Sequence, residues 1–523
     1  MRAPLGPAKS RALLTSAVMN QASSEPLAEP AIFAWPQSAV AGERVELFAA
    51  GPHHIGAQVS VTRIGMRRET VWRADIQLEP HDVSHNTAAN GCDWPVAAEL
   101  TVDPEWRSGY YEVCLRSNAG RSAHEAVGFF VVRNAVSDPS RPLIALATNT
   151  WNAYNDFGGR NLYEGGTHVS FRRPMAKGLL RKPEGHGSRV TVMRTPDHGN
   201  RAHVRYLRDH QFTQWAGSAG WPNYEFPFIQ WAERNWFELD YAINADLEDP
   251  HALDGRSLYL SVGHDEYWSG AKRDTVEAFT NGGGNALFLS GNTAFWQVRL
   301  EANATTMVGY KGLFKRDPVL GTDQQHTLTT MWSDHLLERP ENHMTGVTFV
   351  HGGYHRIGKV VASGAGGYTV YEPEHWIFDG TGVTYGDLIG GESIIVGYEC
   401  DGCDFVMRHG TPIPTGLDGT PADFRILGLA PAQHFNRTNA PRPPADGAPS
   451  EIEYIASRAF ATQSPDAVTS INHGHSVMGI HEPGGFVFTS GSTDWAWGLT
   501  GNSPVVEQIT TTLMTRGVDQ TRR

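Results

Sequence analysis

Cysteine is scarce in this sequence, with four residues in 523: Cys92, Cys114, Cys400 and Cys403. So few cysteines cannot form a disulfide framework for a chain of this length, and such scarcity is typical of proteins in a reducing cytoplasm. We therefore expect a cytoplasmic protein with free thiols. Cys92 and Cys114 fall in predicted strands that would face each other, and even there two free, buried thiols are the preferred interpretation.

The sequence also lacks long apolar runs and an excess of basic residues. No run approaches the roughly 20 residues of a transmembrane helix, so we expect no membrane partner. The net charge is −13, which argues against nucleic acid as a partner because non-specific binding to it needs a basic surface. Residues 1–30 are expected to form a disordered leader, since their apolar patch at 12–14 is too short for a secretion signal.

Motifs of covalent acyl catalysis are missing as well. No Gly-x-Ser-x-Gly or Gly-x-Cys-x-Gly elbow stands out after a predicted strand. Cys400 and Cys403 form a lone Cys-x-x-Cys, without the second pair of ligands that a structural zinc needs and without the helix start of a thioredoxin-like motif. The three glycines at 282–284 follow a predicted helix and precede a strand, which is the reverse of a phosphate-binding loop.

Two strand patterns are present, and they predict two domains. Residues 31–135 contain short runs of strand formers separated by turn residues, which predicts an immunoglobulin-like β-sandwich that covers the catalytic body or serves assembly. In residues 140–516, apolar strands alternate with helices, which predicts a flavodoxin- or glutamine-amidotransferase-like α/β domain with a parallel sheet and β-rich insertions. The expected strands of the parallel sheet are 143–148, 239–243, 258–262, 286–290 and 485–490, and the expected helices are 227–236, 271–280 and 504–514.

Polar residues follow three of these strands. Tyr154 and Asn155 come after the first, His264 and Glu266 after another, and Asn292 after the next. The carboxyl ends of parallel strands meet at one edge of a sheet, where such folds bind ligands. Phenol, carboxylate and amide oxygens there suit a hard, trivalent metal ion. The alternative is an ion pair between His264 and Glu266 that only fixes the end of the strand.

These motifs together resemble the carboxy-terminal catalytic region of the N,N-dimethylformamidase large (beta) subunit family. The resemblance lies between residues 140 and 500 and rests on the order and context of several short matches. They are Trp151-x-x-Tyr154-Asn155, Asn161-Leu162-Tyr163, Gly-His-Asp-Glu-Tyr-Trp at 263–268, the glycines at 282–284, Ser290-Gly291-Asn292, Tyr310-Lys311 and Val487-Phe488-x-x-Gly491-x-x-Asp494-Trp495.

The resemblance implies a mononuclear Fe(3+) site with two tyrosine ligands and one glutamate. Glu266 is the implied carboxylate ligand and Tyr154 the first tyrosine. The second tyrosine is Tyr163, unless the family's ligand aligns with the segment 169–172, where this chain has Phe171. A phenylalanine side chain cannot bind a metal ion.

The resemblance also implies catalytic roles and an activity. His264 would orient Glu266 or act as a base, and Asn292 and Lys311 would stabilise an oxyanion. The implied reaction is hydrolysis of a small N-substituted amide, such as an N,N-dialkylformamide, to a carboxylic acid and an amine. A small partner subunit and a homo-oligomer are further expectations. The alternatives are a non-catalytic binding or assembly protein on the same fold, and an amidohydrolase that holds zinc or manganese through His264, Glu266 and other histidines.

Overall fold

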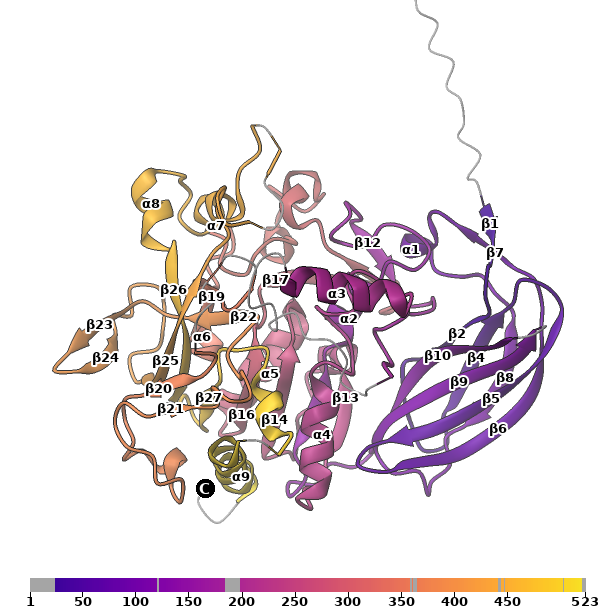
Figure 1. Cartoon of the computed structure of the whole chain (residues 1–523), viewed down its shortest axis with the longest axis horizontal. Coiled ribbons are helices and arrows are strands. Elements are labelled where there is room, and N and C mark those ends of the chain that lie inside the picture. The colour runs from indigo at the N-terminus through magenta and orange to yellow at the C-terminus, as the bar shows by residue number, and fades with distance from the viewer. Residues whose placement is uncertain are drawn as a thin grey trace, which may run out of the picture.

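The computed structural model of the chain describes residues 24–119, 122–183, 198–357, 360, 365–440, 444–445, 447–501 and 503–519 (Figure 1). The leader was expected to extend to residue 30, but strand β1 (Ser24–Pro26) pairs with β7 (Asp82–Ser84). Leu27, just after β1, packs against a buried cluster of the first domain. Residues 1–23, the rest of the expected leader, lie outside the described residues.

The first domain consists mainly of two antiparallel-rich sheets around one core, drawn in indigo and purple in Figure 1. Its three-stranded sheet is β2 (Ala31–Trp35), β4 (Arg44–Ala50) and β8 (Val96–Thr101). Its five-stranded sheet has the order β3 (Ser38–Val40), β10 (Ser122–Arg133), β9 (Gly109–Ala119), β5 (Ile55–Ile64) and β6 (Arg68–Leu78). An immunoglobulin-like topology stays a prediction. Cys92 and Cys114 are free and buried, as expected.

The sheet that contains β9 and β10 is buried on both faces. In β9, Tyr111 and Val113 belong to the core of the first domain, whereas Tyr110 points the other way and joins the core of the second domain. The rings of Tyr110 and Trp221 stack with centroids 4.0 Å apart. Because successive side chains of a strand point to opposite faces, this sheet covers one side of the second domain.

The second domain contains a sheet whose first half is parallel. Its order is β13 (Asp240–Ile243), β11 (Leu143–Leu146), β14 (Leu258–His264), β16 (Asn285–Gly291) and β27 (Val487–Thr489). All four pairings are parallel. Counted along the chain the order is second, first, third, fourth, fifth, which is one of the two common orders of doubly wound α/β sheets. The predicted flavodoxin-like class stays a prediction that this order supports.

The sequence predicted β-rich insertions in the second domain. In the structure, the β-rich segments are continuous with the parallel sheet. Antiparallel pairing continues from β27 through β26 (His473–His481), β25 (Arg425–Gln433), β19 (Thr348–Tyr354) and β22 (Glu399–Gly402). Strands β20 (Tyr368–Val370) and β21 (Leu388–Ile389) pair beside β25. β27 has a parallel neighbour on one edge and an antiparallel neighbour on the other, so it joins the two halves.

Helices cover both faces of the parallel half. In β14, Leu260 and Val262 belong to the cluster that includes α4 (Glu225–Arg234) and α9 (Pro504–Val518). Tyr259 faces the opposite cluster, which includes residues of α5 (Gly270–Asn281). The other elements are α1 (Thr87–Asn90), α2 (Thr148–Tyr154), α3 (His198–Asp209), α6 (Asn342–Thr345), α7 (Glu451–Ala459), α8 (Pro465–Ser470), β12 (His168–Ser170), β15 (Tyr267–Ser269), β17 (Trp296–Glu301), β18 (Thr306–Val308), β23 (Phe405–Arg408) and β24 (Thr411–Pro414).

Among the described residues, no helix has both the length and the apolar character needed to cross a bilayer.

Candidate functional site

The candidate site lies where the strand order of the parallel sheet reverses. Strand β11 leads directly into α2, and its neighbour β14 ends at His264. Ligands of open α/β sheets bind at such a switch point, beyond the carboxyl ends of the strands. The two segments are tied together there, because the backbone N–H of Glu266 donates to Thr150 Oγ1 at 2.9 Å.

Asn161 holds the two candidate tyrosine ligands next to each other. Its Nδ2 donates to the carbonyl of Tyr154 at 3.0 Å, and its Oδ1 accepts from the backbone N–H of Tyr163 at 2.9 Å. The two tyrosine rings stack with their centroids 4.3 Å apart. Trp215 packs against both rings, at 5.6 Å from Tyr154 and 5.1 Å from Tyr163. A single side chain therefore brings both phenols to the end of α2.

Four oxygen atoms meet at the centre of the site. The Tyr163 hydroxyl lies 2.6 Å from the Tyr154 hydroxyl, and 2.7 Å and 2.8 Å from Oε1 and Oε2 of Glu266. One phenol proton cannot satisfy three neighbouring oxygens at once. Oxygen ligands at about 2.0 Å from an octahedral hard cation are themselves about 2.8 Å apart. The donor set and its spacing therefore fit a hard metal ion.

Burial shifts the pKa of the two phenols upward, whereas charged neighbours shift that of the carboxylate downward. Burial raises the pKa of Tyr154 and Tyr163 well above 10, and the negative charge of Glu266 acts in the same direction. The phenols would have to lose their protons to bind a metal ion, which would couple metal binding to proton release. Burial alone would raise the pKa of Glu266, but His264 and Lys311 lower it below its usual value, which keeps the carboxylate ionised for a cation.

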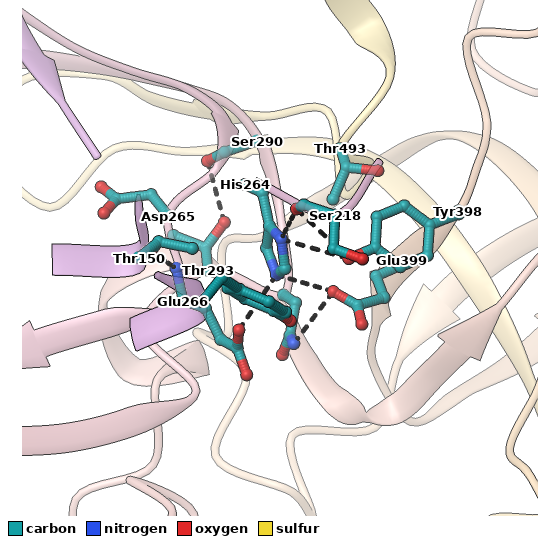
Figure 2. Close-up of polar contacts among 12 residues, drawn as sticks. Thr150, Ser218, His264, Asp265, Glu266, Ser290, Thr293, Tyr398, Glu399 and Thr493 are labelled. Atoms are coloured by element: carbon teal, nitrogen blue, oxygen red, sulfur yellow. Dashed lines mark hydrogen bonds and ion pairs between the residues drawn. The ribbon is translucent and has the colours of Figure 1, made fainter. Parts of the chain in front are cut away.

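His264 lies between two carboxylates, as Figure 2 shows. Its Nε2 is 2.7 Å from Oε2 of Glu399 and 3.3 Å from Oε2 of Glu266. Its Nδ1 is 2.7 Å from the carbonyl oxygen of Ser218 and 3.3 Å from the Tyr398 hydroxyl. Burial disfavours a charged imidazole, but the two carboxylates raise the pKa of His264 well above 6.5. His264 is thus an imidazolium that links Glu266 to Glu399.

Asn292 and Lys311 both reach the site, but through different contacts. Asn292 Nδ2 donates to Oε2 of Glu399 at 3.2 Å. Lys311 Nζ lies 3.4 Å from the centre of the Tyr163 ring and donates to the Tyr267 hydroxyl at 2.7 Å. Burial lowers the pKa of Lys311 to about 8, although the nearby carboxylates oppose this shift. Its ammonium is therefore close to the four oxygens.

Some polar residues named with the site point elsewhere. Asn155 Nδ2 donates to the carbonyl of Pro174, which turns the amide away from Glu266. Asp265 forms a buried ion pair with Lys272 at 2.8 Å. Phe171 is buried in the hydrophobic core, so the phenol beside Glu266 comes from Tyr163.

Sequence reasoning missed the residues of β22. Glu399 contacts His264 and Asn292, and Asp401 accepts from the backbone N–H groups of Asn292 and Thr293 at 3.0 and 3.1 Å. Both carboxyl groups are buried in a strand. The available signal was the two-residue spacing of Glu399 and Asp401, shortly after the apolar run 394–396, since side chains two apart share one face of a strand.

The family model that describes the C-terminal part of N,N-dimethylformamidase beta subunit-like proteins matches residues 58–508. The chain belongs to this family. An N,N-dimethylformamidase beta subunit from Alcaligenes sp is 25% identical over 234 residues, which cover 41% of this chain and 29% of that protein. The match thus spans less than a third of this relative.

Two solved structures show only faint likeness to the chain. A family 123 glycoside hydrolase from Clostridium perfringens has a TM-score of 0.12 at 7% identity, over 24% of this chain and 32% of that one. A b-glucosidase from Erythrobacter marinus has a TM-score of 0.11 at 15% identity, over 21% and 15% of the two chains. Neither carries an argument about fold or function.

Proposed function

We propose that this chain hydrolyses small N-substituted amides, such as N,N-dialkylformamides, with a ferric ion held by Tyr154, Tyr163 and Glu266. The observation that carries the proposal is the convergence of two phenols and one carboxylate within 2.8 Å at the switch point of the sheet. Membership of the dimethylformamidase beta subunit-like family supports the amide as the reacting group.

Glu399 transfers protons in this reaction. Tyr154, Tyr163 and Glu266 would hold a trivalent cation, which would supply Lewis acidity for polarising the amide carbonyl and lowering the pKa of water. Glu399 accepts the proton of the attacking water, and the imidazolium of His264 orients it from 2.7 Å. His264 is less suited to be the base because its ring is already protonated between two carboxylates.

The negative charge that develops on the carbonyl oxygen needs hydrogen-bond donors or cations close by. Lys311 lies over the Tyr163 ring, and the Asn292 amide lies beside Glu399. We assign both to this role. The site residues are almost fully buried, Glu266 and His264 among them, which favours a small substrate.

We also propose that the chain works with a partner subunit. The related protein from Alcaligenes sp is named a beta subunit, so at least one relative belongs to a multi-subunit enzyme. A homo-oligomer stays a prediction. A zinc or manganese site built from His264, Glu266 and further histidines has less support, because within the described ranges no group of three or more His, Cys, Asp or Glu residues is placed to hold a metal ion.

Metal analysis combined with visible spectroscopy tests the proposal. We expect about one iron per chain and the broad visible absorption that phenolate ligands give to ferric iron. With N,N-dimethylformamide as substrate, dimethylamine and formate should appear in equal amounts. Purified protein that binds iron without this absorption would refute the tyrosine ligands. Protein with the absorption but no amide hydrolysis would favour the alternative of a non-catalytic binding protein.

A further inference from the structure

A third carboxyl group, Glu451, faces the site from the first residue of α7. The Tyr354 hydroxyl donates to its Oε2 at 3.1 Å. Tyr354 lies directly opposite Glu399 in the β19–β22 pairing, and opposed residues of an antiparallel pair project from the same face. Glu451 is therefore connected through one tyrosine to the strand position that carries the proposed base.

Aromatic side chains lie between α7 and Lys311 of the site. Tyr354 stacks on Phe435 at 4.0 Å. Tyr454 lies 6.3 Å from Trp296, whose ring is 4.9 Å from Lys311 Nζ. Glu451 and Tyr454, three residues apart, share one face of α7. The Glu451 side chain is 34% accessible, so part of it is open to a small ligand.

The contacts of Glu451 favour its neutral form. Its Oε1 lies 4.0 Å from Nδ1 of His434, and neither atom has a hydrogen-bond partner among the described residues. His434 donates through Nε2 to the carbonyl of Val350 at 3.0 Å. Burial lowers the pKa of His434 to about 4, so its Nδ1 presents a lone pair. An ionised Glu451 would point an anion at this lone pair, whereas a protonated one presents a donor.

The charges around Glu451 act in the same direction. The groups that face it are the Tyr354 phenol, the neutral His434 and the carboxylates of Glu399 and Glu266. Burial raises the pKa of Glu451 to about 8, the Tyr354 hydrogen bond opposes this shift, and the charge of Glu399 adds to it. A carboxyl group that keeps its proton at neutral pH is equipped to act as an acid.

We propose that Glu451 is the acid that protonates the departing amine, and that the carboxylate it leaves holds the ammonium product among the surrounding aromatic rings. This step rests on the proposed amide hydrolysis. The C–N bond breaks, its electron pair stays on nitrogen, and nitrogen takes the proton of Glu451, which gives the neutral amine. The carboxylic acid product then gives its proton to the amine, which forms the ammonium ion and the carboxylate product. Glu399 holds the proton taken from water, and its return through solvent restores Glu451. Aromatic faces beside a carboxylate are suited to an alkylammonium ion.

The test compares two amides in the Glu451→Gln variant. For N,N-dimethylformamide, whose amine is strongly basic, we expect kcat to fall by about 10²–10⁴-fold with little change in KM. For formanilide, whose weakly basic aniline leaves with less need of a proton, the loss should be below about tenfold. The matched control is Glu453→Gln on the same helix, where a Gln keeps the capping box with Ser450 and both activities should persist.

Equal losses for both amides, or no loss for either, would overturn the proposal. Calorimetry with dimethylammonium chloride at about pH 9, where Glu451 with its pKa of about 8 is ionised, gives a readout that does not need turnover. The wild-type protein should bind this ion, and Glu451→Gln should weaken binding at least tenfold while iron content is unchanged. If the wild type hydrolyses neither amide, the proposed function fails. If Glu451→Gln then also binds dimethylammonium as tightly as the wild type does, the proposed amine site fails as well. Tyr354→Phe should weaken the binding of dimethylammonium less than Glu451→Gln, because the carboxyl group remains.

Discussion

Nε2 of His264 lies 2.7 Å from Oε2 of Glu399, and the same nitrogen lies 3.3 Å from the carboxylate of Glu266. One imidazolium thus interacts with two carboxylates that have different surroundings. Glu266 is beside the two phenols, whereas Glu399 is beside the amide of Asn292. In the proposed reaction, Glu266 binds the metal ion and Glu399 transfers protons.

The Glu399→Gln variant should lose proton transfer and keep the metal ion. We expect kcat for N,N-dimethylformamide to fall by about 10²–10⁴-fold, because general base catalysis contributes this much. Iron content and visible absorption should match the wild type, since Glu399 does not contact the phenols. Steady-state kinetics and metal analysis on the same preparation check both points. Loss of iron from this variant would contradict the division between the two carboxylates.

The Tyr163→Phe variant should lose the metal ion. The phenol oxygen is the only atom removed, and it lies within 2.8 Å of Tyr154 and of both carboxylate oxygens of Glu266. We expect iron content and the visible absorption to drop together, measured by elemental analysis and spectroscopy. Tyr259→Phe is the matched control, because Tyr259 is a buried tyrosine of the other core cluster and is no proposed ligand. Full iron content in Tyr163→Phe would exclude Tyr163 as a ligand.

The Asp401→Asn variant should displace the turn that carries Asn292. Both carboxylate oxygens of Asp401 accept backbone N–H groups of this turn, and Asn292 has a left-handed φ of 50°. In the variant, the side-chain NH2 of the asparagine would face one of these backbone N–H groups. Two donors cannot hydrogen-bond to each other, so a buried polar group is left unsatisfied at a cost of about 1–3 kcal/mol. We expect kcat to fall about 10–100-fold with unchanged iron content. Unchanged kcat in a stable variant would show that the turn holds its shape without Asp401.

The sequence predicted the parallel strands and several residues of the site because both depend on local patterns. The apolar runs that became β11, β14 and β16 are short and end at polar residues. Adjacent strand ends then bring His264 and Glu266 close to the end of α2. Motif resemblance added the tyrosines, which periodicity alone does not single out.

Glu399 was not predicted because its place depends on long-range pairing. It reaches the site only because β22 joins the sheet through β19, β25 and β26, and the spacing of polar residues in one strand does not reveal such neighbours. The same holds for Glu451, which is linked through Tyr354 to the strand position of Glu399 and lies in a helix that follows a proline-rich stretch. The local sequence favours a helix or a strand, whereas tertiary contacts determine which of its side chains come close to those of other elements.

Glu225 should make the stability of the protein depend on pH. Its Oε1 accepts from Trp151 Nε1 at 3.1 Å and from the backbone N–H of Ala147 at 3.2 Å, at the start of the helix that carries Tyr154. Burial raises the pKa of Glu225 to about 8 from a usual value of 4.5. The folded state therefore holds a proton that the unfolded state has lost between these two pH values.

The contribution of Glu225 to the free energy of unfolding is therefore fully present below pH 4.5 and is lost as the pH rises through about 8. Between these two pH values, the loss approaches about 1.4 kcal/mol per pH unit. Glu225→Gln has no proton to lose, so urea unfolding at pH 5, 6, 7 and 8 should show this variant gaining stability relative to the wild type at each step. Glu453→Gln is the control. The Ser450 backbone lowers the pKa of Glu453 from 4.5, so Glu453 is ionised in both the folded and the unfolded protein throughout this range. The difference in stability between Glu453→Gln and the wild type should therefore stay constant. A constant difference for Glu225→Gln as well would mean that the Glu225 carboxyl is already ionised in the folded protein at pH 5.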